Sequence, residues 1–135
     1  MKKQKKGATE GGIPIGSVLV IDNKIIGRGY NRRIQKRSAI LHAEMDCLED
    51  TCVLKPSEYQ QVTLYTTLYP CDMCSGAILF YRIRRVIIGE NQTSKGPEEY
   101  LRSRGVELTI LNDDECKALL IDYVQTEGPF ISKQV

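Results

Sequence analysis

The hydrophobic positions of the chain fall into short runs that predict strands alternating with helices. Residues 15–21 are apolar or β-branched almost without a break, which is typical of a strand buried on both faces. An Asp-Asn pair at 22–23 favours a tight turn, so residues 25–30 are predicted to return as the second strand of a hairpin. The polar, basic stretch 31–39 is interpreted as a loop, and residues 41–50 as a short helix.

The middle of the chain continues this alternation. Residues 62–67 alternate branched and aromatic side chains as a strand does, and Pro70 is predicted to occupy the first helical position of a helix at 71–81. That helix is apolar on nearly every side, so we expect it to be deeply buried. Strands are also predicted at 85–89 and 106–111, with a helical crossover at 97–104 between them.

The last helix has the clearest periodicity. Its apolar stripe recurs at i, i+3, i+4, i+7 and i+8 and consists of Cys116, Leu119, Leu120, Tyr123 and Val124. Lys117 and Asp122 fall on the opposite side, which we expect to face water. A hairpin followed by alternating helices and strands predicts an α/β fold: a three-layer α/β/α sandwich around a central five-stranded mixed sheet.

Length and composition indicate a soluble globular domain. The 135 residues match the usual size of one domain, and 41% apolar with 27% charged residues is the composition of a folded soluble protein. We therefore expect one domain over 1–135, with a basic leader at 1–9 and an atypical tail at 126–135. No stretch is long and apolar enough to predict a transmembrane helix.

The charge is nearly balanced, at a net +2, which does not indicate a nucleic-acid groove. Four lysines cluster at positions 2, 3, 5 and 6. We interpret this cluster as a solvated tail rather than a phosphate-seeking arm, and no continuous apolar segment follows it as in a signal peptide. Five cysteines, an odd number, favour a reducing compartment, the cytosol, in which some thiols bind metal.

Two short motifs carry the chemistry: His-Ala-Glu at 42–44 and Pro-Cys-Asp-Met-Cys at 70–74. Neither motif is specific on its own, since an isolated Cys-x-x-Cys also occurs in redox pairs and in halves of structural zinc sites. Together they supply one imidazole and two thiolates, which is a ligand set for a hydrolytic zinc site that keeps a fourth position open for water. We therefore predict a zinc ion held by His42, Cys71 and Cys74.

Glu44 is predicted to stand beside the metal without binding it. From there it could take a proton from zinc-bound water and pass it first to a ring nitrogen and then to the leaving amine. The simpler alternative is an acid favoured at a helix start by the helix dipole. Cys47, about a turn and a half beyond His42, could instead complete a closed four-ligand site.

The pairing of His-x-Glu with Pro-Cys-x-x-Cys is a signature of zinc-dependent nucleobase deaminases. With it, the stretches 10–16 (EGGIPIG), 27–31 (GRGYN) and 35–49 resemble the fungal-type cytosine deaminases and their bacterial relatives, within the cytidine deaminase superfamily. Residues 63–78 and 86–91 are similar to that family as well, and the resemblance covers roughly residues 10–124.

The resemblance implies a homodimer with one zinc per chain that hydrolyses free cytosine to uracil and ammonia in pyrimidine salvage. It also implies that Asn31 hydrogen-bonds the pyrimidine edge and that the backbone at Ala43 contacts the ring. Ile15 and Leu68 would help to form the pocket. Without the resemblance, Asn31 is better accounted for as a loop residue chosen for its turn conformation.

Three features depart from the family pattern. The family's first helix, which covers one sheet face before the EGGIPIG turn, is expected to be missing or replaced by the lysine-rich leader, and an apolar face would then need another cover. Ser94 stands where the family usually carries an aromatic residue that closes over the base. The tail 128–135 has no tryptophan and no acid, although Phe130 could partly replace the lid aromatic.

Two other functions are consistent with the same motifs. Relatives that act on larger substrates, such as a nucleoside or adenosine in transfer RNA, share them, but the chain shows no basic stripe beyond Arg82, Arg84 and Arg85. A weakly active, zinc-stabilised structural subunit would account for the altered ends of the chain, but such a site does not need Glu44.

Overall fold

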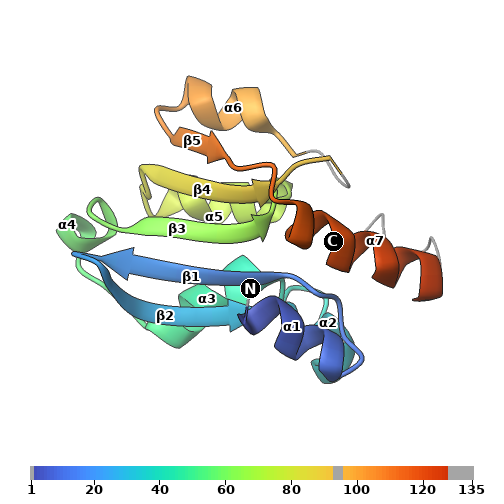
Figure 1. Cartoon of the computed structure of the whole chain (residues 1–135). Coiled ribbons are helices and arrows are strands. Elements are labelled where there is room, and N and C mark those ends of the chain that lie inside the picture. Colours follow the sequence, from blue (N-terminus) through green and yellow to red (C-terminus); the bar gives the residue numbers. More distant parts are fainter. Residues whose placement is uncertain (1, 93–95, 128–135) are drawn as a thin grey trace.

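The computed structural model describes residues 2–92 and 96–127, which form seven helices and five strands around a central sheet (Figure 1). In chain order these elements are α1 (Lys2–Thr9), β1 (Gly16–Ile21), β2 (Lys24–Tyr30), α2 (Arg33–Lys36), α3 (Ala43–Thr51), α4 (Pro56–Tyr59), β3 (Thr63–Leu68), α5 (Asp72–Phe80), β4 (Arg85–Glu90), α6 (Glu98–Ser103), β5 (Glu107–Ile110) and α7 (Asp114–Glu127). The five strands fall where the hydrophobic pattern predicts them, within one or two residues at each end.

The sheet has the strand order β2-β1-β3-β4-β5. β1 runs antiparallel to both β2 and β3, whereas β3, β4 and β5 run parallel to one another. The parallel strands are joined by α5 and α6, which provide the crossovers that parallel neighbours require. This mixed five-stranded sheet with helices confirms the predicted α/β fold class.

The hairpin turn is built from residues with a left-handed backbone. Asp22 and Asn23 have φ angles of 50° and 64°. A tight turn between twisted strands needs such angles, and Asp and Asn tolerate them better than most residues other than glycine. Ile21 pairs directly with Lys24 across this turn, so the predicted turn and return strand are confirmed.

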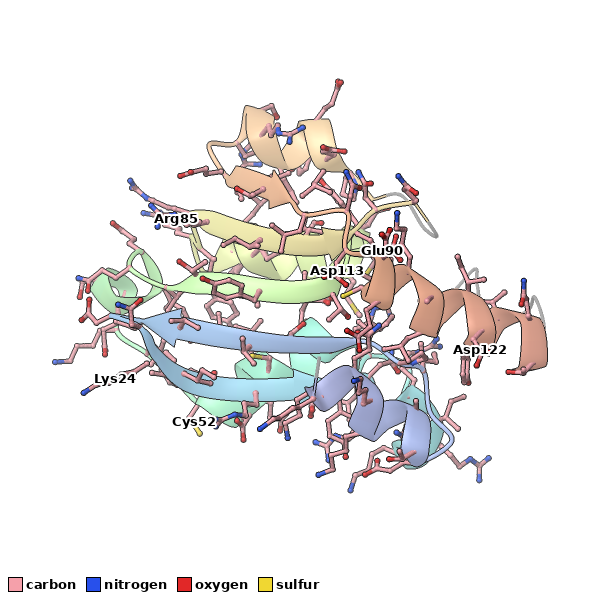
Figure 2. The ribbon with its side chains drawn as sticks, viewed as in Figure 1. Lys24, Cys52, Arg85, Glu90, Asp113 and Asp122 are labelled. Carbon is pink, nitrogen blue, oxygen red and sulfur yellow. The ribbon has the colours of Figure 1, made fainter. Side chains whose placement is uncertain are left out.

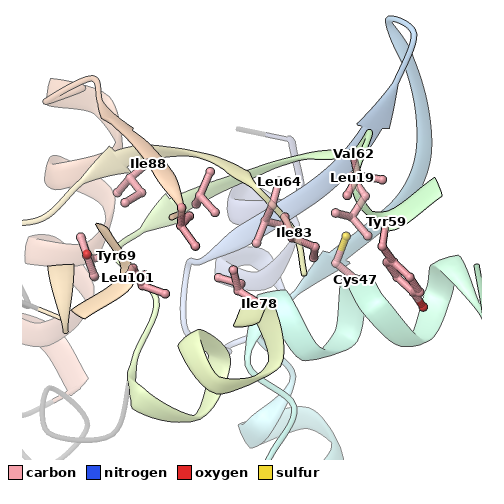
Figure 3. Close-up of a cluster of buried hydrophobic side chains, with 12 residues drawn as sticks. Leu19, Cys47, Tyr59, Val62, Leu64, Tyr69, Ile78, Ile83, Ile88 and Leu101 are labelled. Atoms are coloured by element: carbon pink, nitrogen blue, oxygen red, sulfur yellow. The ribbon is translucent and has the colours of Figure 1, made fainter. Parts of the chain in front are cut away.

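One face of the sheet packs against α3, α5 and α6 and holds the main hydrophobic core (Figure 3). The core consists of Leu19, Cys47, Tyr59, Val62, Leu64, Tyr69, Ile78, Ile83, Val86, Ile88, Leu101 and Val106. Alternate residues of β3 and β4 point to this face, as the two-residue period of a strand dictates. Each of the large apolar side chains stabilises the fold by about 1.5–3 kcal/mol on burial.

The opposite face of the sheet is covered at one end by α1 and α7 (Figure 1). The buried Gln4 of α1 donates a hydrogen bond from Nε2 to the carbonyl of Cys116, at 3.2 Å. Lys5 forms an ion pair with Glu115 of α7, with 2.8 Å between Nζ and Oε1. The start and the end of the described chain are therefore tied to each other.

The helix α1 corrects two predictions, because residues 2–9 are neither a solvated tail nor the site of a lost first helix. Gln4 and Gly7 form its buried side, and the ammonium groups of Lys3 and Lys6 lie over the Tyr30 ring, 5.4 and 5.3 Å from its centre. The side of α1 that contacts the rest of the protein consists of the Gln4 amide, Gly7 and the side chains of Lys3 and Lys6. Because none of these residues is hydrophobic, the hydrophobic pattern could not predict this helix.

Two further expectations need correction. A four-residue helix, α2, interrupts the predicted loop. The helix α5 is not deeply buried, because it packs Cys74, Ser75 and Ile78 inward but leaves Met73 and Phe80 exposed. A helix lying on a sheet buries only one side, so its outer apolar side chains remain in contact with solvent in a single chain.

The last helix confirms its predicted pattern where burial is greatest. Cys116 and Leu120 are buried, while Asp122 projects from α7 into solvent (Figure 2). Lys117, on the predicted polar side, pairs with Asp114 at 3.2 Å. Within residues 2–92 and 96–127, no helix is long and apolar enough to cross a membrane.

Gly29 is required where α3 lies on β2. A Cβ atom there would stand 2.2 Å from the Cys47 amide nitrogen and 2.6 Å from the Ala43 carbonyl oxygen, both backbone atoms of α3. We predict that Gly29→Ala lowers the free energy of unfolding by about 1–3 kcal/mol, measured by denaturant unfolding. Gly12→Ala is the matched control, because the three atoms nearest to its Cβ all belong to the end of the Gln35 side chain and not to backbone. Equal destabilisation by the two variants would contradict this account.

Candidate metal centre and active site

The first turns of α3 and α5 bring the predicted metal ligands together. His42 and Cys71 are the N-cap residues of these helices, and both have an extended backbone. The candidate ligand atoms of His42, Cys71 and Cys74 all lie within 4.8 Å of one another. Pro70 precedes the cap and does not occupy the first helical position, which corrects that prediction: the chain must stay extended at Cys71 for its sulfur to face the helix end.

Cys71 caps its own helix with sulfur. Its Sγ accepts a hydrogen bond from the Cys74 amide at 3.5 Å, the role that a Ser or Asp oxygen plays at most N-caps. The same Sγ lies 3.5 Å from Nδ1 of His42. These contacts join both sulfur ligands and the imidazole into one cluster.

The two thiols share one proton. A hydrogen bond from the Cys74 thiol, followed by contacts to His42 and the Cys74 amide, lowers the pKa of Cys71 to about 4 although burial opposes this shift. The same hydrogen bond between the two sulfurs, together with burial, raises the pKa of Cys74. Cys71 is therefore a thiolate at neutral pH, and a metal that binds both sulfurs must displace the proton held by Cys74.

This donor set fits zinc. One imidazole and two sulfurs are zinc ligands of suitable softness, and three protein ligands leave one position for water. Cys47 does not belong to the cluster: it lies in the main core (Figure 3), and burial raises its pKa to about 12. Cys116 is likewise buried, with its pKa raised to about 12. Cys52 is exposed (Figure 2) and does not belong to the His42, Cys71 and Cys74 group. Among the described residues, the alternative of a closed site completed by Cys47 is not formed.

Glu44 lies beside the metal ligands without belonging to their group. Its Oε1 accepts hydrogen bonds from Thr66 Oγ1 at 2.6 Å and from Ser17 Oγ at 3.3 Å. Burial raises the pKa of Glu44, and hydrogen bonds from Cys74 and Thr66 oppose that rise. A carboxyl whose pKa is moved towards neutrality is suited to taking up and releasing a proton.

A small pocket joins the catalytic motif to the residues expected to bind substrate. Its volume is about 10 Å³, and it is lined by Ile15, Asn31, His42, Ala43, Glu44, Leu68, Tyr69 and Cys71. The structure therefore brings all four predicted substrate residues beside Glu44 and two of the three ligands. Their roles remain predictions, but their convergence does not follow from chain proximity, since they come from segments far apart in the sequence.

Asn31 has the hydrogen bond expected of a turn residue, and its binding role stays a prediction. Its Oδ1 accepts a hydrogen bond from the Arg33 amide at 3.1 Å, as a turn asparagine does. Its Nδ2 is buried and has no hydrogen-bond partner among the described residues. An unsatisfied buried donor is costly, and this one lies in a residue that lines the small pocket.

Three residues of the site were not predicted from the sequence. Ser17 and Thr66 hold Glu44, and both lie at strand positions where hydrophobic patterning gives no chemical signal. Tyr69 lines the pocket although its ring belongs to the main core (Figure 3). Ser94, Phe130 and the rest of the tail 128–135 lie outside the described residues.

A family model described as the cytidine and deoxycytidylate deaminase zinc-binding region matches residues 1–90. The chain belongs to this deaminase family. A cytosine deaminase of Candida albicans is 48% identical over 126 residues, which span 93% of this chain and 84% of that protein. A tRNA-specific adenosine deaminase of Bacillus subtilis is 41% identical over 90 residues, which span 66% of this chain and 56% of that protein.

Solved structures with a similar fold extend the comparison. One, from a study of A-to-I editing by tRNA:A34 deaminases, aligns with a TM-score of 0.64 at 26% identity and covers 81% of this chain and 91% of that chain. RibD of Acinetobacter baumannii aligns with a TM-score of 0.72 at 22% identity and covers 93% of this chain and 37% of that chain. The second likeness supports the fold alone. The family is therefore a hydrolytic deaminase family whose members differ in substrate.

The ligand assignment predicts which cysteines zinc binding requires. Cys71→Ser and Cys74→Ser each remove a sulfur from the cluster, so we expect zinc affinity to fall by more than about 100-fold. Cys52→Ser is the matched control and should bind zinc as the wild type does, because its thiol is exposed and remote from the cluster. Competition with a chromogenic chelator measures the affinities; undiminished zinc binding by Cys71→Ser would refute the assignment.

Proposed function

We propose that this protein hydrolyses free cytosine to uracil and ammonia with one zinc ion per chain, in pyrimidine salvage. The observation that carries the proposal is the pocket itself, in which Asn31 lies with Glu44 and the zinc ligand His42. Within the described part of the chain, the Nδ2 of Asn31 has no hydrogen-bond partner. The extent of the match to the Candida albicans cytosine deaminase, 93% of this chain, supports the same substrate.

The chain's own residues divide the reaction among them. His42, Cys71 and Cys74 would hold zinc, which supplies Lewis-acid activation of the attacking water. Glu44 accepts one proton of that water and delivers it to the ring nitrogen beside the amino-bearing carbon, while the water oxygen bonds to that carbon. Glu44 then takes the remaining proton of this oxygen and passes it to the amino group. The exocyclic carbon–nitrogen bond breaks as the oxygen becomes a carbonyl, so cytosine and water become uracil and ammonia with no other reactant.

Substrate recognition in this proposal uses few groups. Asn31 Nδ2 donates to an acceptor on the pyrimidine edge, while the backbone at Ala43 contacts the ring. Ile15 and Leu68 are buried members of a second hydrophobic cluster that includes Ala43, and they provide apolar contacts to the ring. A pocket of about 10 Å³ has to widen to admit a base, and a single base requires less widening than a nucleoside.

The second candidate is an enzyme for a larger substrate, such as a nucleoside or adenosine in transfer RNA. Its support is the 41% identity to a tRNA-specific adenosine deaminase, although the chain spans about half of that protein. The arginines at 82, 84 and 85 do not favour it. They lie where β4 begins, whereas Cys71 follows the end of the parallel neighbouring strand β3. The three arginines and the group of candidate zinc ligands therefore lie at opposite ends of these strands. The presence of Glu44 in a hydrogen-bonded site argues against a purely structural subunit.

Substrate turnover tests the proposal directly. We expect the zinc-loaded protein to release ammonia from cytosine, with no turnover of adenosine in a transfer-RNA anticodon stem-loop. Glu44→Gln should keep zinc and lose kcat by about 10²–10⁴-fold, because it cannot transfer protons. Ammonia release and bound zinc are measured on the same samples. Deamination of the RNA without deamination of cytosine would overturn the proposal in favour of the second candidate.

Asn31 supplies a second arm of the same experiment. Asn31→Ala removes the proposed donor to the base, so KM for cytosine should rise by about tenfold while zinc content stays unchanged. Because Asn31 also supports the local turn, Asn31→Asp is the partner variant: it keeps the acceptor oxygen of the turn but not the donor. Unchanged KM in both variants would show that Nδ2 does not contact substrate.

We also propose a homodimer formed through the outer side of α5. A groove of about 900 Å³ includes Leu54, Val53 and Phe80 among its lining residues. Val53 is 93% exposed and Phe80 78% exposed, and the rings of Tyr59 and Tyr81 stack beside them with centroids 4.9 Å apart. An exposed apolar surface of this kind marks an interface, and a second copy of the same surface would cover it.

The dimer proposal predicts the effect of a charge at its centre. Phe80→Asp should give a monomer of about the 15.3 kDa chain mass, where the wild type has twice that mass, because burying an unpaired carboxylate opposes association. Leu111→Asp is the matched control, since Leu111 is 60% exposed and does not line the groove. Light scattering measures the masses; a dimeric Phe80→Asp protein would locate the interface elsewhere.

The cysteines support an intracellular, cytoplasmic location in this proposal. All five are free thiols, and two of them must remain reduced to bind zinc. A reducing compartment maintains that state without special protection.

A further inference from the structure

Ser17 and Thr66 form a hydrogen-bonded pair behind Glu44. They are directly opposed in the antiparallel pairing of β1 with β3, so their side chains lie on the same face of the sheet. Ser17 Oγ donates to Thr66 Oγ1 at 2.9 Å, and Thr66 Oγ1 donates to Glu44 Oε1 at 2.6 Å. The longer Ser17–Glu44 contact, 3.3 Å, ends on the same carboxylate oxygen.

The direction of this chain is fixed by proton count. Each hydroxyl has one proton to donate, and Thr66 makes its shorter bond to the carboxylate, so Ser17 is the donor to Thr66. Ser17, Thr66 and Glu44 are 3%, 3% and 4% exposed. With water excluded, no solvent molecule competes for these bonds, and successive hydroxyls in a chain polarise one another.

Both hydroxyls converge on Oε1. The terminal torsion of a glutamate is otherwise soft, with a broad range of carboxylate orientations. A chain of two hydroxyls that ends on this one oxygen restricts that rotation and leaves Oε2 as the oxygen for proton exchange. Simple burial of an acid requires a hydrogen bond, but it does not require a chain of hydroxyls from two adjacent strands.

We infer that Ser17 and Thr66 are positioning residues for deamination: they lock Oε1 of Glu44 against the sheet so that Oε2 exchanges the proton with the reacting water and base. This inference rests on the proposed function. It assigns to the two hydroxyls an effect on the rate of proton transfer, separate from zinc binding and substrate affinity. Neither residue belongs to the His42, Cys71 and Cys74 group or lines the small pocket that contains Asn31 and Glu44.

Thr66→Val is the main test, because it removes the hydroxyl and keeps the branched shape. We expect kcat for cytosine to fall by about 10- to 100-fold, since misplacing a reacting group has effects of this size, with KM within about twofold of the wild type and zinc content unchanged. Thr66→Ser should restore most of the rate. Thr63→Val, on the same strand with its side chain on the opposite face, is the matched control and should behave as the wild type.

Ser17→Ala gives a second, milder perturbation. It removes the outer donor but leaves the Thr66–Glu44 bond, so we expect only a few-fold loss of kcat. If Thr66→Val fails to fold, as judged by thermal unfolding, Ser17→Ala still decides the question. A kcat equal to that of the wild type in Ser17→Ala, and in Thr66→Val where that variant folds, would overturn the positioning role.

A readout independent of activity separates this inference from the proposed function. In crystal structures of the zinc-loaded proteins, the Glu44 carboxylate should be single and ordered in the wild type and rotated or multiple in Thr66→Val. If cytosine is not turned over by the wild type but Glu44 rotates in Thr66→Val, the proposed substrate fails and the positioning role stands. An unchanged Glu44 orientation in Thr66→Val would overturn the positioning role, whatever the substrate.

Discussion

The site depends on one constraint: the positive ends of two helices, α3 and α5, must meet at a single point. Each helix start carries about half a positive charge from its free amides, so two such ends repel each other and repel a cation. The sulfur ligands resolve this conflict. Cys71 is a thiolate that accepts a hydrogen bond from the Cys74 amide. The sulfur of Cys74 becomes negative when it loses its proton on metal binding. Negatively charged sulfur ligands are therefore favoured at this site because His42, Cys71 and Cys74 all lie at the positive ends of the two helices.

The rest of the fold keeps the two helix starts in place. Asp46, in the first turn of α3, accepts a hydrogen bond from the Tyr30 amide at 3.1 Å and forms an ion pair with Arg32. It thus ties the helix to the end of β2, beside the turn that carries Asn31. Gly29 lets α3 approach that strand closely. Because α5 directly follows β3, which pairs with β1, the positions of both N-caps are set by neighbouring strands of one sheet.

The sequence predicts the strands, the mixed sheet and the grouping of His42, Cys71 and Cys74 because these depend on local patterns and on residue chemistry. It fails where contacts are long-range and polar. The helix α1 buries Gln4 against the backbone of Cys116, 112 residues away, and no periodic pattern encodes such a bond. Pro70 is predicted at the first helical position because proline is favoured there, but that position is Asp72, two residues later, since Cys71 is the N-cap of α5.

Ser17 and Thr66 show why part of the active site escapes prediction from a hydrophobic pattern. Their strand neighbours on the same face, Leu19, Leu64 and Leu68, are buried apolar residues, so alternation calls for apolar side chains at both positions. A buried hydroxyl costs stability unless it is hydrogen-bonded. Here Ser17 donates to Thr66 and Thr66 donates to Glu44, which is itself an acid that burial disfavours. Ser17, Thr66 and Glu44 are each polar at a buried position, and their hydrogen bonds are made to one another. Local violations that compensate in this way identify a functional site, and they become visible only when the strands and α3 are assembled.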